Sequence, residues 1–278
     1  MTNETIKGIV DNAKRSFQVE DGDYIQDGLT FCGNCNTPKE AVITLLGQKM
    51  KVPCLCRCKN EEYEQERKAE KEIQRQIKIN QLRINSLQDK SLLSCEFAKA
   101  EMTKQLEAVM RYANKWGEML KRNIGLLLWG NTGTGKTFAA GCVANELISK
   151  GVPVLMTSFP KLLMGITGQA WESKEDYIKS LSAYKLLIID DLGVERESSF
   201  AMEQVYNVID DRYKLNLPLI VTTNLTIDEI RNAKNIDCQR IYDRILEMCI
   251  PINFAGESKR KKAAKDKLEE ARRILNSD

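Results

Sequence analysis

Short apolar runs alternate with amphipathic stretches from about residue 92 onward. Five of the runs have the length of buried strands, at residues 124–129, 152–156, 186–189, 219–221 and 250–254. Helical patterns fit between them, and Ser173 with Asp176 and Thr226 with Glu229 have the spacing of capping boxes. This alternation predicts an α/β fold, in which a parallel five-stranded sheet is flanked by helices on both faces.

A charged stretch without glycine or proline precedes this region, from residue 59 to about residue 90. Its acidic and basic side chains interleave at helical spacing, although the support is mixed. Glu64 precedes Lys68 by one turn, which favours a helix, but Glu66 precedes Glu70, which does not. We predict a solvated linker helix. Beyond Gly256 the chain becomes basic, and we expect a last helix with a solvated face there.

The composition is that of an ordinary globular protein, with 278 residues of which 42% are hydrophobic and 29% charged. This length accommodates one core of about 180 residues and a smaller module. The longest apolar runs are strand-sized and no secretion signal opens the chain, so we expect no membrane contact and a cytoplasmic location. A net charge of +3 does not by itself predict nucleic-acid binding. The absence of histidine excludes histidine acid–base catalysis and imidazole metal ligands.

A glycine-rich motif directly follows the run at residues 124–129 and precedes a helical pattern at residues 138–149. A strand, a loop and a helix in this order are the context that a phosphate-binding loop requires. The glycines let backbone amides curl around a phosphate, and the positive end of the helix dipole points to the same place. Lys136 is expected to contact the β- and γ-phosphates, and Thr137 to ligate Mg²⁺. The predicted ATP-binding residues are Gly130, Asn131, Thr132, Gly133, Thr134, Gly135, Lys136 and Thr137.

Polar residues end two of the later strands. Asp190 and Asp191 follow the run at residues 186–189, and we predict that Asp190 holds Mg²⁺ through water while Asp191 orients the attacking water. Asn224 ends the next strand, which we expect to lie between the two motif strands and to bring a polar group to the γ-phosphate or the water. Arg240 and Arg244 lie one helical turn apart, as an arginine finger or, alternatively, as a surface Arg–Asp pair.

The first 58 residues contain five of the nine cysteines, as a Cys-x2-Cys pair and an alternating triplet. This spacing predicts a tetrahedral four-thiolate Zn²⁺ site, whose metal would be part of the stability of so small a module. Cys32, Cys35, Cys56 and Cys58 are the favoured ligands, with Cys54 as the alternative to one of the last two. Disulfides would need an oxidising compartment. The other cysteines are expected to be buried packing residues: Cys95, Cys142, Cys238 and Cys249.

The phosphate loop, Leu-Ile-Ile-Asp-Asp, Thr-Thr-Asn, an Arg-x2-Asp-Arg helix and a closing Ser-x-Arg follow one another in this order. This order resembles the DnaC/IstB group of AAA+ ATPases, particularly bacterial and phage DnaC-like helicase loaders, over about residues 92–262. The cysteine pattern before a charged helix is also similar to the N-terminal module of many such loaders. The resemblance implies Walker A residues Lys136 and Thr137, Walker B residues Asp190 and Asp191, sensor 1 at Asn224, an arginine finger at Arg244 and sensor 2 at Arg260.

The chain departs from the general AAA+ pattern in two ways. The water-orienting acid is usually Glu, and Asp191 is one methylene shorter, which affects the expected rate of hydrolysis more than nucleotide binding. The segment after Arg260 is short, so the separate helical lid domain of many AAA+ proteins is expected to be missing.

The resemblance implies an ATP-dependent helicase loader that binds single-stranded DNA and delivers a DnaB-like replicative helicase. It divides the chain into a zinc-binding, helicase-interacting module (1–58), the linker helix (59–91) and the AAA+ domain (92–278). It also implies self-association, in which Arg244 completes the site of the next subunit. Candidate anchors for the helicase are the aromatic residues Phe17, Tyr24 and Phe31. Positive charge near the second strand comes from Lys161, Lys174, Lys179 and Lys185, which solvated lysines explain equally well.

Three other functions remain open. The first is an IstB-like transposase helper ATPase that binds duplex DNA, against which the cysteine module argues because it suggests a different partner. The second is a nucleotide-dependent adaptor, in which Asp191 leaves hydrolysis negligible. A small-molecule kinase is less favoured, because no lid arginine cluster or substrate motif is evident.

Overall fold

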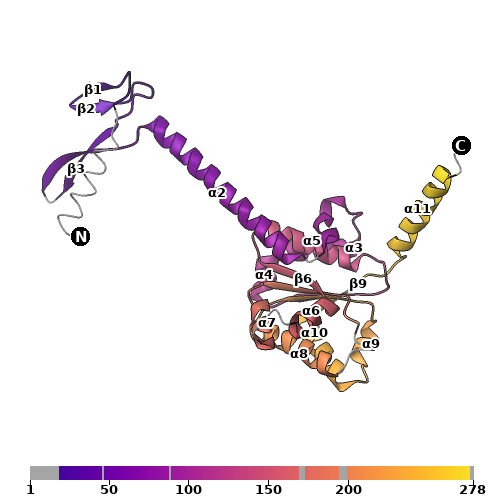
Figure 1. The fold of residues 1–278 in the computed structure, drawn as a ribbon. Helices are drawn as coiled ribbons and strands as arrows, with labels where there is room; N and C mark the ends of the chain where they lie inside the picture. Colours follow the sequence, from indigo (N-terminus) through magenta and orange to yellow (C-terminus); the bar gives the residue numbers. More distant parts are fainter. Residues whose placement is uncertain (1–18, 46, 88, 169–172, 194–198, 276–278) are drawn as a thin grey trace. The chain divides into compact units, whose positions relative to one another are not determined.

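A computed structural model describes residues 19–45, 47–87, 89–168, 173–193 and 199–275 (Figure 1). Phe17, one of the expected anchors, lies outside these residues. The chain divides into two compact units, Met1–Gln76 and Ile77–Asp278. Helix α2 (Arg57–Ser86) begins in the first unit and ends in the second, so the boundary between the units falls inside a helix.

Two short antiparallel hairpins form the strands of the first unit. Strand β1 (Tyr24–Gln26) pairs with β2 (Leu29–Phe31), and β3 (Glu40–Leu45) pairs with β4 (Gln48–Pro53). Among the described residues of this unit, Cys32 and Cys56 are the only buried hydrophobic side chains. So small an apolar core cannot offset the entropy of ordering the chain, and the unit therefore needs another source of stability.

The last two turns of α2 belong to the core of the second unit. Ile79 is buried there, and Leu82 packs against the same core one turn later. Leu87, just beyond the helix, forms a parallel bridge with Met156. The expectation of a helix solvated up to about residue 90 is therefore wrong for this end, because a charged composition concealed a short apolar stripe.

The second unit contains a parallel five-stranded sheet, as the alternating pattern predicted. Its strands are β5 (Gly125–Trp129), β6 (Val154–Ser158), β7 (Leu186–Asp190), β8 (Leu219–Thr223) and β9 (Cys249–Asn253). Their order in the sheet is β6-β7-β8-β5-β9, with every pair parallel. Because β8 lies between β7 and β5, the carboxyl ends of the strands that carry the three polar motifs are adjacent at one edge.

Helices cover both faces of this sheet (Figure 1). One face packs on α3 (Lys104–Asn114), α4 (Trp116–Lys121) and α5 (Lys136–Ser149). The other packs on α6 (Phe159–Thr167), α7 (Lys174–Leu181), α8 (Ser199–Lys214) and α10 (Ile236–Met248). Leu126 and Leu128 point to the first face and Leu127 to the second, which is the alternation of a strand buried on both sides.

The starts of two helices agree with the sequence pattern. Ser173 accepts a hydrogen bond from the backbone N–H of Asp176 at 3.1 Å at the start of α7. Thr226 and Glu229 form a complete capping box at the start of α9 (Ile227–Arg231). Each cap satisfies backbone donors that the first helical turn leaves without partners.

A buried arginine fastens α8 to its neighbours. The guanidinium of Arg212 donates hydrogen bonds to the carbonyl oxygens of Leu181, Tyr184, Lys185 and Pro218 at 2.9–3.2 Å. These carbonyls lie just before β7 and β8. The side chain therefore fixes the approach to both strands.

Short 3₁₀ helices η1 (Lys90–Ser94) and η2 (Phe97–Lys99) lead into α3. Beyond β9, the described residues contain one further helix, α11 (Lys259–Leu275), whose described side chains are almost all exposed. This agrees with the expected solvated last helix. No helix among the described residues has both the length and the apolar character that a membrane span requires.

Candidate functional site

The glycine-rich loop connects β5 to α5, as its strand–loop–helix context predicted. Gly130, Gly133 and Gly135 have φ values of 126°, 81° and 101°, which residues with side chains rarely adopt. Space is a second constraint, because a Cβ on Gly133 would lie 2.2 Å from Oγ of Ser258. The loop thus requires glycine both for its backbone conformation and for the close approach of the segment after β9.

Lys136 begins α5, and its ammonium group is buried at the centre of the site. It donates hydrogen bonds to the carbonyl oxygens of Gly130 at 2.7 Å and Asn131 at 2.8 Å, and to Oδ1 of Asn224 at 2.8 Å. Burial lowers the pKa of Lys136 from its ordinary value, while the negative charges of Asp191 and Asp190 act in the opposite direction. A buried cation beside two carboxylates is suited to bind the negative charge of a phosphate.

The two acids at the end of β7 are held by β8. Oγ1 of Thr222 donates to Oδ1 of Asp190 at 2.6 Å and accepts a hydrogen bond from the backbone N–H of Asp191 at 2.8 Å. Nδ2 of Asn224 donates to Oδ1 of Asp191 at 2.9 Å. Asn224 therefore touches both Lys136 and Asp191, which places it between the two motifs, as the strand order requires.

The segment after β9 closes the loop from the other side. The backbone N–H of Lys259 donates to the carbonyl oxygen of Gly133 at 2.9 Å. Arg260 lies at the start of α11 and lines the same cavity as Lys136, where its positive charge adds to the lowering of the pKa of Lys136. The structure thus brings the expected sensor 2 arginine to the phosphate loop.

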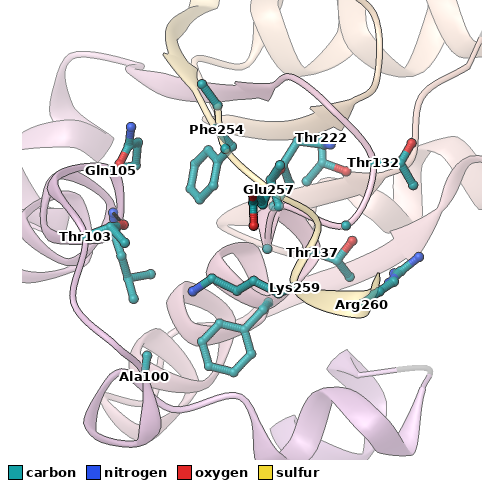
Figure 2. A pocket seen from close by; sticks show the side chains of 18 of the residues that line it. Ala100, Thr103, Gln105, Thr132, Thr137, Thr222, Phe254, Glu257, Lys259 and Arg260 are labelled. Atoms are coloured by element: carbon teal, nitrogen blue, oxygen red, sulfur yellow. Dashed lines mark hydrogen bonds between the residues drawn. The ribbon is translucent and has the colours of Figure 1, made fainter. Parts of the chain in front are cut away.

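A cavity of about 700 Å³ lies beside this cluster, within the second unit. Figure 2 shows Ala100, Thr103 and Gln105 on one side of it, and Thr132, Thr137 and Arg260 on the other. The volume and the mixture of apolar and polar walls suit a nucleotide whose phosphates lie at the glycine-rich loop. The remaining lining residues include Lys99, Glu101, Leu106, Phe138, Phe254 and Glu257.

The sequence interpretation missed the wall formed by residues 99–106 and by the segment from Phe254 to Glu257. Residues 99–106 carry no motif, and they reach the cavity only because α3 packs beside α5. The position of Phe254 in the cavity wall could have been predicted, because this residue directly follows a strand whose carboxyl end lies beside the phosphate loop.

Arg244 lies elsewhere, on α10. Its guanidinium contacts Oε2 of Glu247 at 3.0 Å and Oδ1 of Asp210 at 3.4 Å, and it stacks over the ring of Tyr213 with 4.2 Å to the centroid. Arg240 lies over the ring of Tyr206 at 5.8 Å. Among the described residues that line the nucleotide cavity, neither arginine is present.

Four cysteines of the first unit come together at one point. The thiol sulfurs of Cys32, Cys35, Cys56 and Cys58 all lie within 4.8 Å of one another. Cys54 lies outside this cluster, because it is exposed and its thiol donates to the carbonyl oxygen of Pro38 at 3.5 Å. The structure thus assembles the favoured set of four cysteines and not the alternative that includes Cys54.

The thiol cluster has the donor set and spacing of a tetrahedral zinc site. Cys32 and Cys58 have sulfurs 3.7 Å apart, near the roughly 3.8 Å edge of a tetrahedron with Zn–S bonds of about 2.3 Å. A hydrogen bond with Thr37 lowers the pKa of Cys35 to about 5, while a hydrogen bond with Cys56 raises that of Cys58 to about 12. Zinc binds thiolates, so a bound cation would replace the protons of these thiols.

The oxygen donors of the phosphate site suit a different metal. Thr137 offers a hydroxyl and Asp190 a carboxylate, and both line the cavity. Mg²⁺ prefers oxygen ligands, and binds through one or two carboxylates together with the phosphates of a substrate. These residues therefore fit Mg²⁺ bound with a nucleotide. When bound, the metal would neutralise the charge of the phosphates.

The fold and the phosphate site together define an AAA+ P-loop protein of the DnaC/IstB group. The family described as "IstB-like ATP binding protein" matches residues 60–267, well over half of the chain, and the chain belongs to this family.

The remaining cysteines agree with the sequence interpretation, because Cys95, Cys142, Cys238 and Cys249 are all buried.

Two curated relatives are replicative helicase loaders. The chain is 26% identical to DnaI of Bacillus subtilis (strain 168) over 147 residues, which are 49% of this chain and 47% of that protein. It is 27% identical to DnaC of Escherichia coli (strain K12) over 158 residues, which are 55% of this chain and 63% of that protein. The chain therefore spans about half the length of the curated relatives that it matches.

The solved structures show the same fold. A crystal structure of DnaI matches 60% of this chain and 95% of its own length, with a TM-score of 0.52 and 22% identity. A putative primosome component from Streptococcus pyogenes matches 63% of this chain with a TM-score of 0.51 and 19% identity.

Proposed function

We propose that this chain is an ATP-dependent helicase loader, which binds ATP and single-stranded DNA and delivers a DnaB-like replicative helicase. The observation that carries the proposal is the pairing of a complete phosphate site with a four-thiol cluster in one chain of the IstB-like family. Relatives that are named replicative helicase loaders support the same role.

The phosphate site supplies the chemistry of ATP hydrolysis. Lys136 would contact the phosphates, Thr137 and Asp190 would hold Mg²⁺, and Asp191 would orient the attacking water. Asn224 contacts both Lys136 and Asp191, so it would report a bound γ-phosphate to the residue that positions the water.

Arg244 would act on the site of a neighbouring subunit. Its helix α10 lies outside the cavity that Lys136 lines, and its side chain, 32% exposed, is held at the surface by Asp210 and Glu247. A fixed surface arginine is suited to enter the phosphate site of another copy, where its charge would stabilise the transferred phosphoryl group. Self-association would then be required for full activity.

The first unit would dock the helicase, with Zn²⁺ holding its hairpins together. Tyr24 and Phe31 are candidate anchors, since their rings stack at 5.7 Å and the side chain of Tyr24 is exposed. The scarcity of buried apolar groups among the residues described in this unit explains why a metal would be needed there.

A nucleotide-dependent adaptor is the second candidate, and the backbone of Asp191 favours it. Asp191 has φ of 57°, a left-handed conformation that Asp tolerates better than Glu does. The shorter acid would hold the water farther from the phosphate and slow hydrolysis. Measuring turnover beside ATP affinity separates the adaptor from the ATPase.

The decisive experiment offers tagged full-length chain two purified partners, a DnaB-like helicase and an IS21-type transposase, with ATP or ADP. Retention of the helicase, and not the transposase, is the expected result. Cys56→Ser should lose the helicase, while Cys54→Ser, which changes an exposed cysteine outside the cluster, should keep it. Retention of the transposase alone would replace the proposal with that of a transposase helper.

A further inference from the structure

Thr222 occupies the point where β7 and β8 separate. The backbone ladder between the two strands ends with the pair of Ile189 and Val221, and Thr222 is the next residue of β8. Its carbonyl oxygen accepts a hydrogen bond from the N–H of Leu192 at 2.8 Å. Its hydroxyl group forms hydrogen bonds with both acids of the phosphate site, Asp190 and Asp191. Where the backbone pairing of β7 and β8 ends, the side chain of Thr222 thus connects the two segments through its own hydrogen bonds.

We propose that Thr222 is a positioning residue, which orients the Asp190 carboxylate toward Mg²⁺ and fixes the backbone of Asp191. This inference rests on the proposed nucleotide hydrolysis. The sequence interpretation assigned a role to Asn224, two residues later, and none to Thr222, although both belong to the Thr-Thr-Asn motif.

The hydroxyl group makes two contacts that act on different parts of the two acids. It donates to Oδ1 of Asp190 at 2.6 Å, which restricts rotation of that carboxylate and leaves acceptor capacity on it for a metal or a metal-bound water. It accepts the N–H of Asp191 at 2.8 Å, which holds the residue at φ of 57°. One side chain thus couples the two acids.

Burial makes these contacts effective. Thr222 lines the cavity but is only 1% exposed, so little water reaches its hydroxyl group. Groups that orient metal ligands in this way commonly change metal affinity or activity about 10- to 100-fold when they are removed.

The same strand provides a matched control. Thr223 is also 1% exposed, and its hydroxyl group donates to the carbonyl oxygen of Leu192 at 2.7 Å and accepts the N–H of Leu225 at 3.2 Å. Thr223→Val therefore removes two buried hydrogen bonds of the same kind without touching either acid. This variant therefore measures the effect of losing a buried hydroxyl group on the fold, without a change in the contacts of either acid.

The test compares Thr222→Val, Thr222→Ser and Thr223→Val in the full-length chain, by turnover as a function of Mg²⁺ concentration. Thr222→Val should lower kcat about 10-fold or more and raise the Mg²⁺ concentration for half-maximal turnover, with little change in ATP affinity without Mg²⁺. Thr222→Ser keeps the hydroxyl group and should restore both values to within about threefold of wild type. Thr223→Val should leave both near wild type.

A second readout does not depend on turnover. Calorimetry with a non-hydrolysable ATP analogue, with and without Mg²⁺, gives the gain in affinity due to the metal, which Thr222→Val should reduce and Thr223→Val should not. If Thr222→Val fails to fold, Thr222→Ala, which introduces no bulk, carries the same expectation. Equal Mg²⁺ responses in the Thr222 and Thr223 variants would overturn the assignment. A wild-type chain without turnover would instead contradict the proposed ATPase, while calorimetry would still decide the role of Thr222.

Discussion

At the scale of single residues, the phosphate site is a connected set of polar contacts. Asp191, Asn224 and Lys136 form a chain of hydrogen bonds that continues to the carbonyl oxygens of the glycine-rich loop. Each member has a partner even though the groups are partly buried, which avoids the cost of an unpaired buried polar atom. A bound phosphate would compete for Lys136, and so would be sensed by Asn224 and then by Asp191.

Two substitutions separate binding from hydrolysis at this scale. Lys136→Ala should abolish ATP binding, because it removes the buried cation at the centre of the site. Asp191→Asn should keep ATP binding but stop turnover, because an amide cannot act as the acceptor that orients water. ATP affinity by calorimetry and phosphate release by a steady-state assay measure the two effects.

The control is Lys185→Ala, which removes an exposed lysine and should change neither quantity. Equal ATP affinity in wild type and Lys136→Ala would contradict the assignment of the site.

At the scale of elements, α10 carries Arg244, the candidate arginine finger, and Asp210 and Tyr213 of α8 contact its guanidinium group. Arg244→Ala should bind ATP nearly normally yet hydrolyse it on the order of a thousandfold more slowly, since a finger acts on the transition state. Mixed with Lys136→Ala, it should regain activity, because its intact phosphate site receives Arg244 from the other chain. Turnover of each variant alone and of the mixture checks this.

Arg240, one turn earlier, is the competing finger and undergoes the same mixing test. If neither arginine variant is rescued although mixed assembly is demonstrated, the arginine acts within its own chain or only in the structure.

The buried arginine of α8 provides a prediction about stability. Arg212→Met should lower the free energy of unfolding by about 3 kcal/mol, because four carbonyl oxygens each lose a hydrogen bond from a buried guanidinium group. Lys214→Met, on the same helix, removes the ion pair between an exposed lysine and the buried Asp210. Because Asp210 keeps Arg244 as a partner, this change should cost at most about 1 kcal/mol. Denaturant unfolding followed by circular dichroism compares the two. Similar losses in both variants would show that the Arg212 contacts contribute little.

At the scale of the whole molecule, the two units differ in what stabilises them. The second has apolar clusters on both faces of its sheet, whereas the first has four thiols and almost no buried apolar side chains among its described residues. We therefore expect about one Zn²⁺ per chain, and expect chelation to unfold the first unit while the second remains folded. Elemental analysis and hydrogen exchange before and after chelation measure these effects.

Cys32→Ser should reproduce the effect of chelation, and Cys54→Ser should not. Less than about a tenth of an equivalent of zinc in protein purified without chelators would contradict the site.

The local sequence predicted the five strands of the second unit, with ends that lie within about two residues of the observed ones. Apolar runs of strand length, a glycine loop that needs positive φ and paired acids after a strand are local signals, because they depend on neighbouring residues and on backbone sterics. The parallel order then followed from strand–helix alternation. The cysteine spacing favoured the four thiols that come together, but it left Cys54 open as an alternative.

Only the tertiary structure decided which distant segments share a site. Residues 99–106 reach the nucleotide cavity, the end of α2 joins a core, and Thr222 bridges two acids some thirty positions earlier in the chain. Residues 99–106 carry no motif, the apolar stripe at the end of α2 is hidden in a charged stretch, and the Thr-Thr-Asn motif did not reveal the contacts of Thr222. A contact between elements depends on how they pack and not only on the residues adjacent in sequence. Arg244 is a further example. Its position in the sequence would allow it to act in the phosphate site of its own chain, and only the packing of α10 places it outside that cavity.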